Sequence, residues 1–258
     1  MTLPAHAHVQ RLLVFLSKHW RALLLLFLGV LLPLLGFVKI AEEVYEKEPF
    51  AFEEPLMLAI HAGASTALND FTRFLSLFGN TAGMLPLTGL LSILLYRIRP
   101  RLAYFLLLAL GGTVAINTVL KQFFDRPRPA FWTPFLPEPD FSFPSGHAMF
   151  ASALVSAVVV ILWFTRWRLP ALICGAAYVL AMMWSRVYIG VHYPTDVTAG
   201  ALVSVAWVVG LNYVLHVHQI LRPALSRPTE QLRKTEDNSP QETSSASVQE
   251  VDVVSHRE

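Results

Sequence analysis

The chain has 258 residues, of which 54% are hydrophobic and only 15% are charged, and its mean hydropathy is +0.50. Soluble domains use about a quarter charged residues, so this composition excludes an ordinary water-soluble globule and predicts a membrane protein. The formal net charge of +2 lacks the basic excess that nucleic-acid binding requires.

Six stretches of the chain are each long and apolar enough to cross a bilayer as a helix, which takes about 20 residues. The first resembles a signal peptide because basic residues precede it, but no small-residue cleavage pattern follows, so we expect an uncleaved anchor. The sequence therefore predicts an all-α, polytopic membrane protein with six transmembrane helices. The six stretches are residues 22–40, 74–96, 102–120, 147–165, 169–189 and 197–217.

The predicted helices divide the chain into three parts. Residues 1–21 form an N-terminal segment, residues 22–220 form the six-helix domain, and the polar residues 221–258 form a tail. We expect the tail to be disordered, because it has too little apolar surface to offset the entropy of ordering. The acidic segment 41–73, between the first two helices, is predicted to be either an interfacial helix or a packed connector.

Basic residues in the connectors indicate the face of the membrane, because cytoplasmic loops are rich in Lys and Arg. Most of them precede the first helix, follow the sixth, or lie between the second and third and between the fourth and fifth. All these positions fall on one side, so both termini are predicted to be cytoplasmic. An anionic ligand would explain the basic residues on the opposite, outer side, which are Lys121, Arg126, Arg128 and Arg186.

Three short motifs lie at the outer ends of the third to sixth predicted helices. Each alone has an ordinary interpretation, as cations that reach for lipid headgroups, as a structural histidine, or as a serine that caps a helix. Their convergence on one face favours a single site instead. The motifs are Lys121 with Arg128-Pro129, then Pro144-Ser145-Gly146-His147, and finally Ser185-Arg186 with His192 and Asp196.

The basic and small residues of these motifs suit the binding of a phosphoryl group. Lys121, Arg128 and Arg186 would neutralise its oxygens, and the planar fork of arginine matches those oxygens in pairs. Ser145 and Gly146 begin the fourth predicted helix, where free backbone N–H groups and the helix dipole attract an anion. The sequence therefore predicts a phosphate site at the outer face.

The two histidines of the motifs supply reactive groups. His192 precedes Asp196 by four residues, so at a helix start the carboxylate would hold one ring nitrogen and orient the other as a nucleophile. His147 is then left to protonate the leaving oxygen. Within the first motif, Asp125 and Arg126 are expected to form a local salt bridge.

At these motifs the chain resembles the type 2 phosphatidic acid phosphatase superfamily, the metal-independent lipid phosphatases related to vanadium haloperoxidases. The resemblance covers roughly residues 70–217. It implies that His192 attacks phosphorus to form a phosphohistidine, that Asp196 orients it, and that His147 acts first as acid and then as base. It implies no metal and no cofactor. The residues that it implies for holding the phosphoryl group are Lys121, Arg128, Ser145, Gly146 and Arg186.

The sequence thus predicts a phosphatase of the bacterial plasma membrane with its active site facing outward. A site at membrane level favours a lipid substrate, namely undecaprenyl diphosphate, phosphatidylglycerophosphate or phosphatidic acid. The alternative is a transporter or channel with an outer phosphate-binding vestibule. Charged residues at one face, rather than near the midplane, weigh against that alternative.

Overall fold

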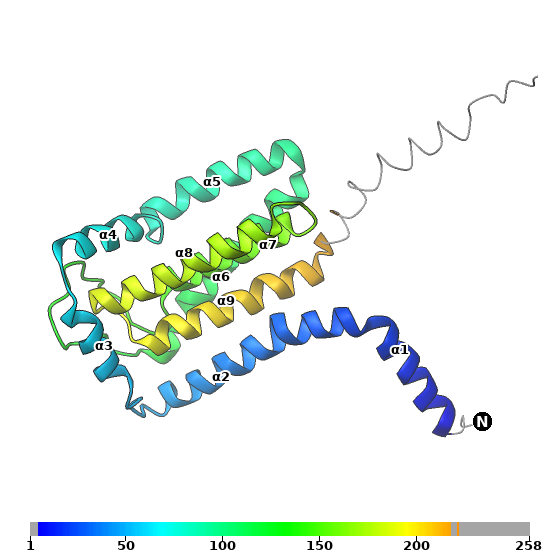
Figure 1. Cartoon of the computed structure of the whole chain (residues 1–258), viewed down its shortest axis with the longest axis horizontal. Helices are drawn as coiled ribbons and strands as arrows, with labels where there is room; N and C mark the ends of the chain where they lie inside the picture. The colour runs from blue at the N-terminus through cyan, green and yellow to red at the C-terminus, as the bar shows by residue number, and fades with distance from the viewer. Residues whose placement is uncertain (1–4, 218–220, 222–258) are drawn as a thin grey trace, which may run out of the picture.

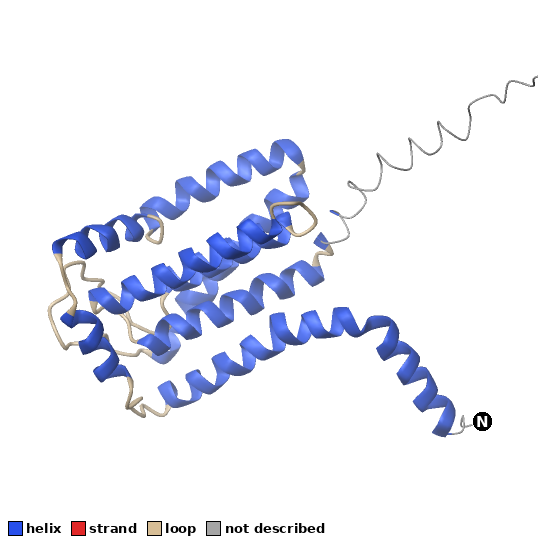
Figure 2. Cartoon of the chain, in the orientation of Figure 1, coloured by secondary structure: helices blue, strands red, loops and turns tan. Residues whose placement is uncertain are grey.

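The computed structural model describes residues 5–217 and Leu221, and it contains no β-strand within that part of the chain (Figure 2). Apart from Leu221, the predicted tail lies outside the described residues. The elements are α1 (Ala5–Leu26), the π-helical turn η1 (Phe27–Leu31), α2 (Leu32–Tyr45), α3 (Glu53–Ala62), α4 (Thr66–Leu77), α5 (Thr81–Ile98), α6 (Pro100–Phe124), α7 (Gly146–Leu162), α8 (Arg168–Ile189) and α9 (Pro194–Val214).

Four helical segments are long and apolar enough to span a membrane: Leu16–Tyr45, Pro100–Phe124, Arg168–Ile189 and Pro194–Val214. The pair Thr66–Leu77 and Ala82–Ile98, bent by 48°, makes a fifth if it counts as one span. Helix α7 is apolar but has only 17 residues. By length and composition the chain is therefore a multi-pass membrane protein with four or five such spans among the described residues, fewer than the six predicted.

The second predicted span, residues 74–96, is divided because a capping sequence lies inside the apolar stretch. Helix α4 ends at Leu77, and Asn80 caps the start of α5 by accepting a hydrogen bond from the Gly83 amide at 2.9 Å. Asparagine at this position satisfies a free amide of the new helix and so favours a fresh start. The acidic segment, residues 41–73, forms the end of α2, the short helix α3 and the beginning of α4.

Helix α7 is central to the bundle, where it packs against α6, α8 and α9 (Figure 1). Helix α2 packs along α9, and α5 packs against α6. The largest buried cluster draws on α6, α7 and α9, and Phe105, Phe150 and Val208 are among its members. Burial of this surface among the helices fixes their relative positions, although in lipid the association depends mainly on close packing.

The two ends of the bundle differ in what they carry. Helices α3 and α4 and the connectors 125–145 and 190–193 gather at one end, at the left of Figure 1. The turns from α5 to α6 and from α7 to α8 lie at the other end. The basic residues of those turns, from Arg97 to Arg101 and from Arg166 to Arg168, are therefore at the opposite end from the three motifs.

Candidate active site

The motif residues meet at the end of the bundle that carries α3 and α4. Helices α6, α7, α8 and α9 each begin or end there, so each contributes side chains from a terminal turn. The predicted site residues are distributed as follows: Lys121 in the last turn of α6, Arg128 in the following connector, Ser145, Gly146 and His147 at the start of α7, Arg186 in the last turn of α8, His192 just before α9, and Asp196 in its first turn.

The carboxylate of Glu138 lies at the centre of these residues. Its Oε2 is 2.8 Å from Nη2 of Arg128 and 3.4 Å from Nε2 of His192. Its Oε1 is 3.4 Å from Nδ1 of His147 and 3.5 Å from Nη1 of Arg186. Four side chains from four parts of the fold thus surround one anionic group, and we call the space that this carboxylate fills the anion seat.

A second carboxylate of the same connector, Asp140, pairs with Lys121 and Arg128. Burial alone would raise the pKa of Glu138, but its contacts with His192, His147 and Arg128 outweigh burial and leave that pKa well below its usual value. Burial would also raise the pKa of Asp140, and Lys121 and Arg128 outweigh it likewise. Both side chains are therefore anions at neutral pH, and they balance the positive charge of the seat.

The imidazole of His192 is fully buried, and its orientation is set by a backbone oxygen. Nδ1 lies 2.8 Å from the carbonyl oxygen of Ser142, whereas Oδ2 of Asp196 is 3.5 Å away. A carbonyl oxygen only accepts, so Nδ1 is the nitrogen that carries hydrogen, and Nε2 faces the anion seat. Asp196 lies beside the ring as expected, but the shorter hydrogen bond goes to Ser142, for which the sequence gives no signal.

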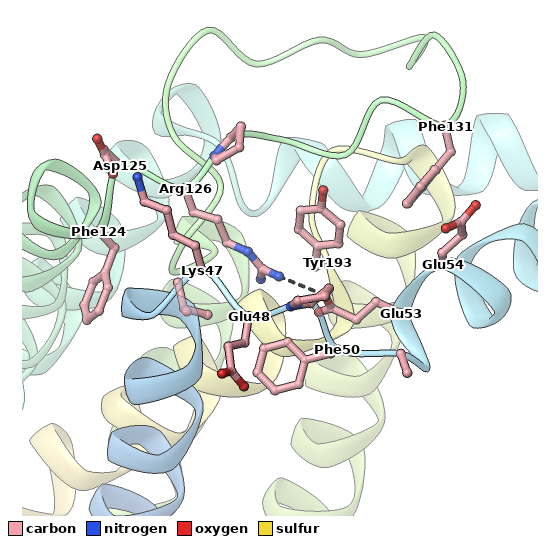
Figure 3. A pocket seen from close by; sticks show the side chains of 14 residues that line it. Lys47, Glu48, Phe50, Glu53, Glu54, Phe124, Asp125, Arg126, Phe131 and Tyr193 are labelled. Carbon is pink, nitrogen blue, oxygen red and sulfur yellow. Dashed lines mark hydrogen bonds and ion pairs between the residues drawn. The ribbon is translucent and has the colours of Figure 1, made fainter.

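The predicted salt bridge between Asp125 and Arg126 does not form. Asp125 ends α6 in the left-handed conformation, with φ of 41°, and Arg126 turns instead to two distant carboxylates. Its Nη1 is 2.6 Å from Oδ1 of Asp196, and its Nη2 is 2.8 Å from Oε2 of Glu53. Figure 3 shows the contact between Arg126 and Glu53 beside a pocket. Arg126 therefore belongs to the surroundings of Asp196.

Arg186 is 1% exposed and is held on both sides by serine hydroxyls. Its Nε donates to Oγ of Ser185 at 3.2 Å, and its Nη2 donates to Oγ of Ser76 on α4. With those nitrogens engaged, Nη1 points to the seat, 3.4 Å from Nε2 of His147. Ser76, which the sequence did not single out, therefore helps to aim the guanidinium.

Ser145 precedes α7 as expected, but its side chain does not cap the helix. Its hydroxyl is buried and has no hydrogen-bond partner among the described residues. Its amide donates to the carbonyl of Asp196 at 3.2 Å, which ties the second motif to the third. The hydroxyl of Ser145 is therefore available to an anion at the start of α7.

His147 fits because the neighbouring turn carries a glycine. A β-carbon on Gly79 would lie 2.3 Å from Cδ2 of His147, so any larger residue there would displace the ring. Among residues 5–217 and 221, no three His, Cys, Asp or Glu side chains form a group that could hold a metal ion.

A family model described as the PAP2 superfamily matches residues 102–220 of this chain. An undecaprenyl-diphosphatase from Sulfolobus acidocaldarius is 31% identical over 196 residues, which cover 74% of this chain and 87% of that protein. A phosphatidylglycerophosphatase B from Bacillus subtilis is 36% identical over 143 residues, which cover 52% of this chain and 68% of that protein.

Two solved structures share the arrangement of helices. A transmembrane PAP2-type phosphatidylglycerolphosphate phosphatase from Bacillus subtilis aligns with a TM-score of 0.66 and 24% identity, over 72% of this chain and 95% of that chain. LpxE from Aquifex aeolicus aligns with a TM-score of 0.54 and 26% identity, over 63% of this chain and 95% of that chain. The first of these likenesses establishes a common fold.

Proposed function

This chain belongs to the PAP2 superfamily and is a lipid phosphate phosphatase, and we propose that it acts through a phosphohistidine on His192. The observation that carries the proposal is the Glu138 carboxylate, an anion of the chain itself that four side chains surround. A phosphoryl group has more oxygens and more negative charge than a carboxylate, so it suits the same seat. A transporter or channel is not supported, because the relatives are phosphatases.

In the proposed first step, Nε2 of His192 attacks phosphorus while the bond from phosphorus to the leaving oxygen breaks. His147 gives that oxygen a proton. The leaving group is a lipid alcohol when the substrate is a phosphomonoester, and a lipid monophosphate when the substrate is a diphosphate. In the second step, His147 takes a proton from water, which attacks the phosphohistidine. This step releases inorganic phosphate and restores the free imidazole.

The remaining motif residues bind and orient in this proposal. Lys121, Arg128 and Arg186 neutralise the phosphoryl oxygens, whose charge increases toward the transition state. The hydroxyl of Ser145 and the first amides of α7, beginning at Gly146, donate to the same oxygens. Asp196 supports the orientation of the His192 ring together with the Ser142 carbonyl.

We further propose that the site faces outward across a bacterial plasma membrane, with six spans within residues 22–220. The first 21 residues and the tail, residues 221–258, are cytoplasmic in this arrangement. The support is the charge of the connectors, because the basic turns at Arg97–Arg101 and Arg166–Arg168 are at the end of the bundle away from the seat. Helix α7 is short for a span, and it is surrounded by other helices rather than by lipid alone.

Phosphate release is expected to persist in excess chelator, because the proposed nucleophile is an imidazole and the proposed electrophilic groups are side-chain cations. The measurement is phosphate release by purified protein in detergent, with undecaprenyl diphosphate, phosphatidylglycerophosphate and phosphatidic acid supplied in turn. Turnover of at least one lipid, unchanged by chelator, supports the proposal and identifies the preferred substrate. Activity that chelator removes and a divalent cation restores would contradict it.

Substituting Glu138 by glutamine is expected to lower KM about 10-fold. The seat is filled by the Glu138 carboxylate, and a site that is free for only a fraction of the time binds its ligand more weakly by that fraction. The amide keeps the shape but loses the charge that competes with phosphate. The measurements are KM for the lipid and inhibition by inorganic phosphate, which should strengthen in parallel. Glu54→Gln, on α3 and outside the seat, is the control.

A raised KM in Glu138→Gln would mean that the carboxylate assists binding rather than competing with it. A fall in kcat with KM unchanged would instead assign Glu138 a part in the chemical steps. Either result would contradict competition for the seat.

A further inference from the structure

Arg126 lies within the spacer of the first motif, and its contacts lead away from the anion seat. The guanidinium bridges two carboxylates, with 2.6 Å from Nη1 to Asp196 and 2.8 Å from Nη2 to Glu53. The side chains of Arg126, Glu53 and Asp196 are 13%, 5% and 0% exposed. One largely shielded cation therefore joins α3 to the first turn of α9.

Glu53 also forms hydrogen bonds directly with the start of α9. Its Oε1 accepts hydrogen bonds from the backbone amide of Thr195, at 3.2 Å, and from the hydroxyl of the same residue. Nη1 of Arg126 donates to that hydroxyl as well, at 2.8 Å. These three hydrogen bonds form a closed set around Thr195, so the position of α9 beside His192 depends on α3, an element that the three motifs do not include.

Two aromatic rings confine the guanidinium of Arg126. Its central carbon lies 4.1 Å from the ring centroid of Tyr193 and 5.9 Å from that of Phe50. The face of an aromatic ring attracts a cation and restricts its movement. Arg126 is therefore held in place both by its ion pairs and by these two aromatic rings.

This arrangement leaves the Asp196 carboxylate a single orientation. Oδ1 is held by Arg126, and Oδ2 accepts from the backbone amide of Tyr193 at 2.8 Å while it lies 3.5 Å from Nδ1 of His192. Without Arg126, the buried carboxylate of Asp196 would lose its partner charge, and an unpaired buried charge is strongly unfavourable. The Asp196 carboxylate would then rotate or attract water, and its distance from the His192 imidazole and its orientation toward that ring would change.

We propose that Arg126 and Glu53 are positioning residues of the phosphatase, which hold Asp196 and the start of α9 so that His192 presents Nε2 to the seat. The inference rests on the proposed function, because it assumes that His192 is the nucleophile. Arg126 and Glu53 act through Asp196 and not on the substrate. Their loss is therefore expected to slow the chemical steps and to leave lipid binding intact.

The first test compares kcat and KM for Arg126→Ala, Arg126→Lys and Glu53→Gln with those of the wild type. Arg126→Ala should lower kcat about 10- to 100-fold with little change in KM, as a small misplacement of reacting groups does. Arg126→Lys should recover only part of the rate, because one ammonium cannot contact both carboxylates as a planar fork does. Glu53→Gln should lower kcat less than Arg126→Ala, because Arg126 keeps its contact with Asp196.

Glu54→Gln is the matched control for Glu53→Gln. Glu54 is the next residue of α3 and lines the same pocket, but it is exposed and lies outside the set around Thr195. Its replacement should leave kcat unchanged. Equal losses in Glu53→Gln and Glu54→Gln would overturn the inference, since they would reflect a general effect of charge on α3.

Chemical rescue separates positioning from a failure to fold. Arg126 lines a pocket of about 470 Å³ between α2, α3 and the connector after α6, through which a small cation can reach the space left in Arg126→Ala (Figure 3). Millimolar guanidinium should therefore raise kcat of Arg126→Ala severalfold, whereas potassium at equal ionic strength should not. His192→Ala should gain nothing from guanidinium.

The outcomes distinguish the inference from the function on which it rests. A wild-type protein that releases no phosphate from any of the lipids would overturn the proposed function. An active wild type with an equally active Arg126→Ala would overturn only the positioning role. The positioning role would also be overturned if Arg126→Ala raised KM instead of lowering kcat, or if guanidinium did not restore part of the lost kcat.

Discussion

His192→Ala is expected to lower kcat by about 10⁴-fold or more, the scale seen when a nucleophile is removed from an enzyme that forms a covalent intermediate. The imidazole is fully buried, with Nδ1 engaged by the Ser142 carbonyl and Nε2 turned to the seat, so its removal takes the proposed nucleophile out of the seat. His147 contacts the same carboxylate, but through its own Nδ1 and from the start of α7. It therefore faces Oε1 of Glu138, whereas His192 faces Oε2.

The measurement for His192→Ala is phosphate release in detergent with chelator, together with trapping of an acid-labile phosphoenzyme by rapid quenching. Lipid binding should survive, because Lys121, Arg128 and Arg186 remain. His61→Ala is the control, since His61 lies at the same end of the bundle but stacks on Trp132, with ring centroids 4.0 Å apart. Phosphoenzyme formed at the normal rate in His192→Ala would move the nucleophile to another residue.

The meeting of the motif residues at one end of the bundle could be predicted because it depends on patterns that are local in the sequence. The length of each apolar stretch determines where its helix ends. Because successive helices cross the membrane in opposite directions, their order determines which motifs lie at the same face. Lys121, His147 and Arg186 were each expected at an outer helix end, and α6, α7 and α8 do bring them to one end of the bundle. Six spans were predicted by the same reasoning, and the described residues contain four or five segments of sufficient length, because Asn80 caps a new helix inside one stretch and α7 has only 17 residues.

The partners of the motif residues could not be predicted, because they are distant in sequence and depend on packing. Glu53 meets Thr195 across 142 residues, and nothing in the pattern of the acidic segment distinguishes it from its neighbour Glu54. Arg126 was predicted to form a salt bridge with Asp125 because adjacent opposite charges form the simplest pair. The left-handed backbone at Asp125 directs the chain away from that pairing.

Glu138 was missed for a related reason. A glutamate in a polar outer connector is ordinarily solvated, and sequence alone gives no reason to place one among four cationic or titratable side chains. The connector 125–145 brings the carboxylate beside Arg128 and His192, with the Glu138 side chain only 20% exposed. Its position nevertheless follows a simple rule, since cations that are largely shielded from water are stabilised by an anion beside them.

Arg186→Ala is expected to lower kcat about 10²- to 10³-fold, the usual effect of removing one group that stabilises developing charge in a transition state. Arg186 is fully buried, and its fork is fixed by Ser76 on α4 and Ser185 on its own helix, so that Nη1 is aimed at the seat before any substrate arrives. A group that is already oriented contributes more to catalysis than one that must be ordered during the reaction. The loss should therefore appear in kcat as well as in kcat/KM.

Arg186→Lys tests whether charge alone is sufficient. A lysine has one ammonium group, which cannot contact the Ser76 hydroxyl and the seat together, so we expect most of the rate to remain lost. Arg168→Ala, at the opposite end of the same helix, is the control and should keep the wild-type rate. Full activity in Arg186→Lys would show that the seat needs only a positive charge at this point. The serine contacts of Arg186 would then serve to join α4 to α8 and would have no part in aiming the guanidinium.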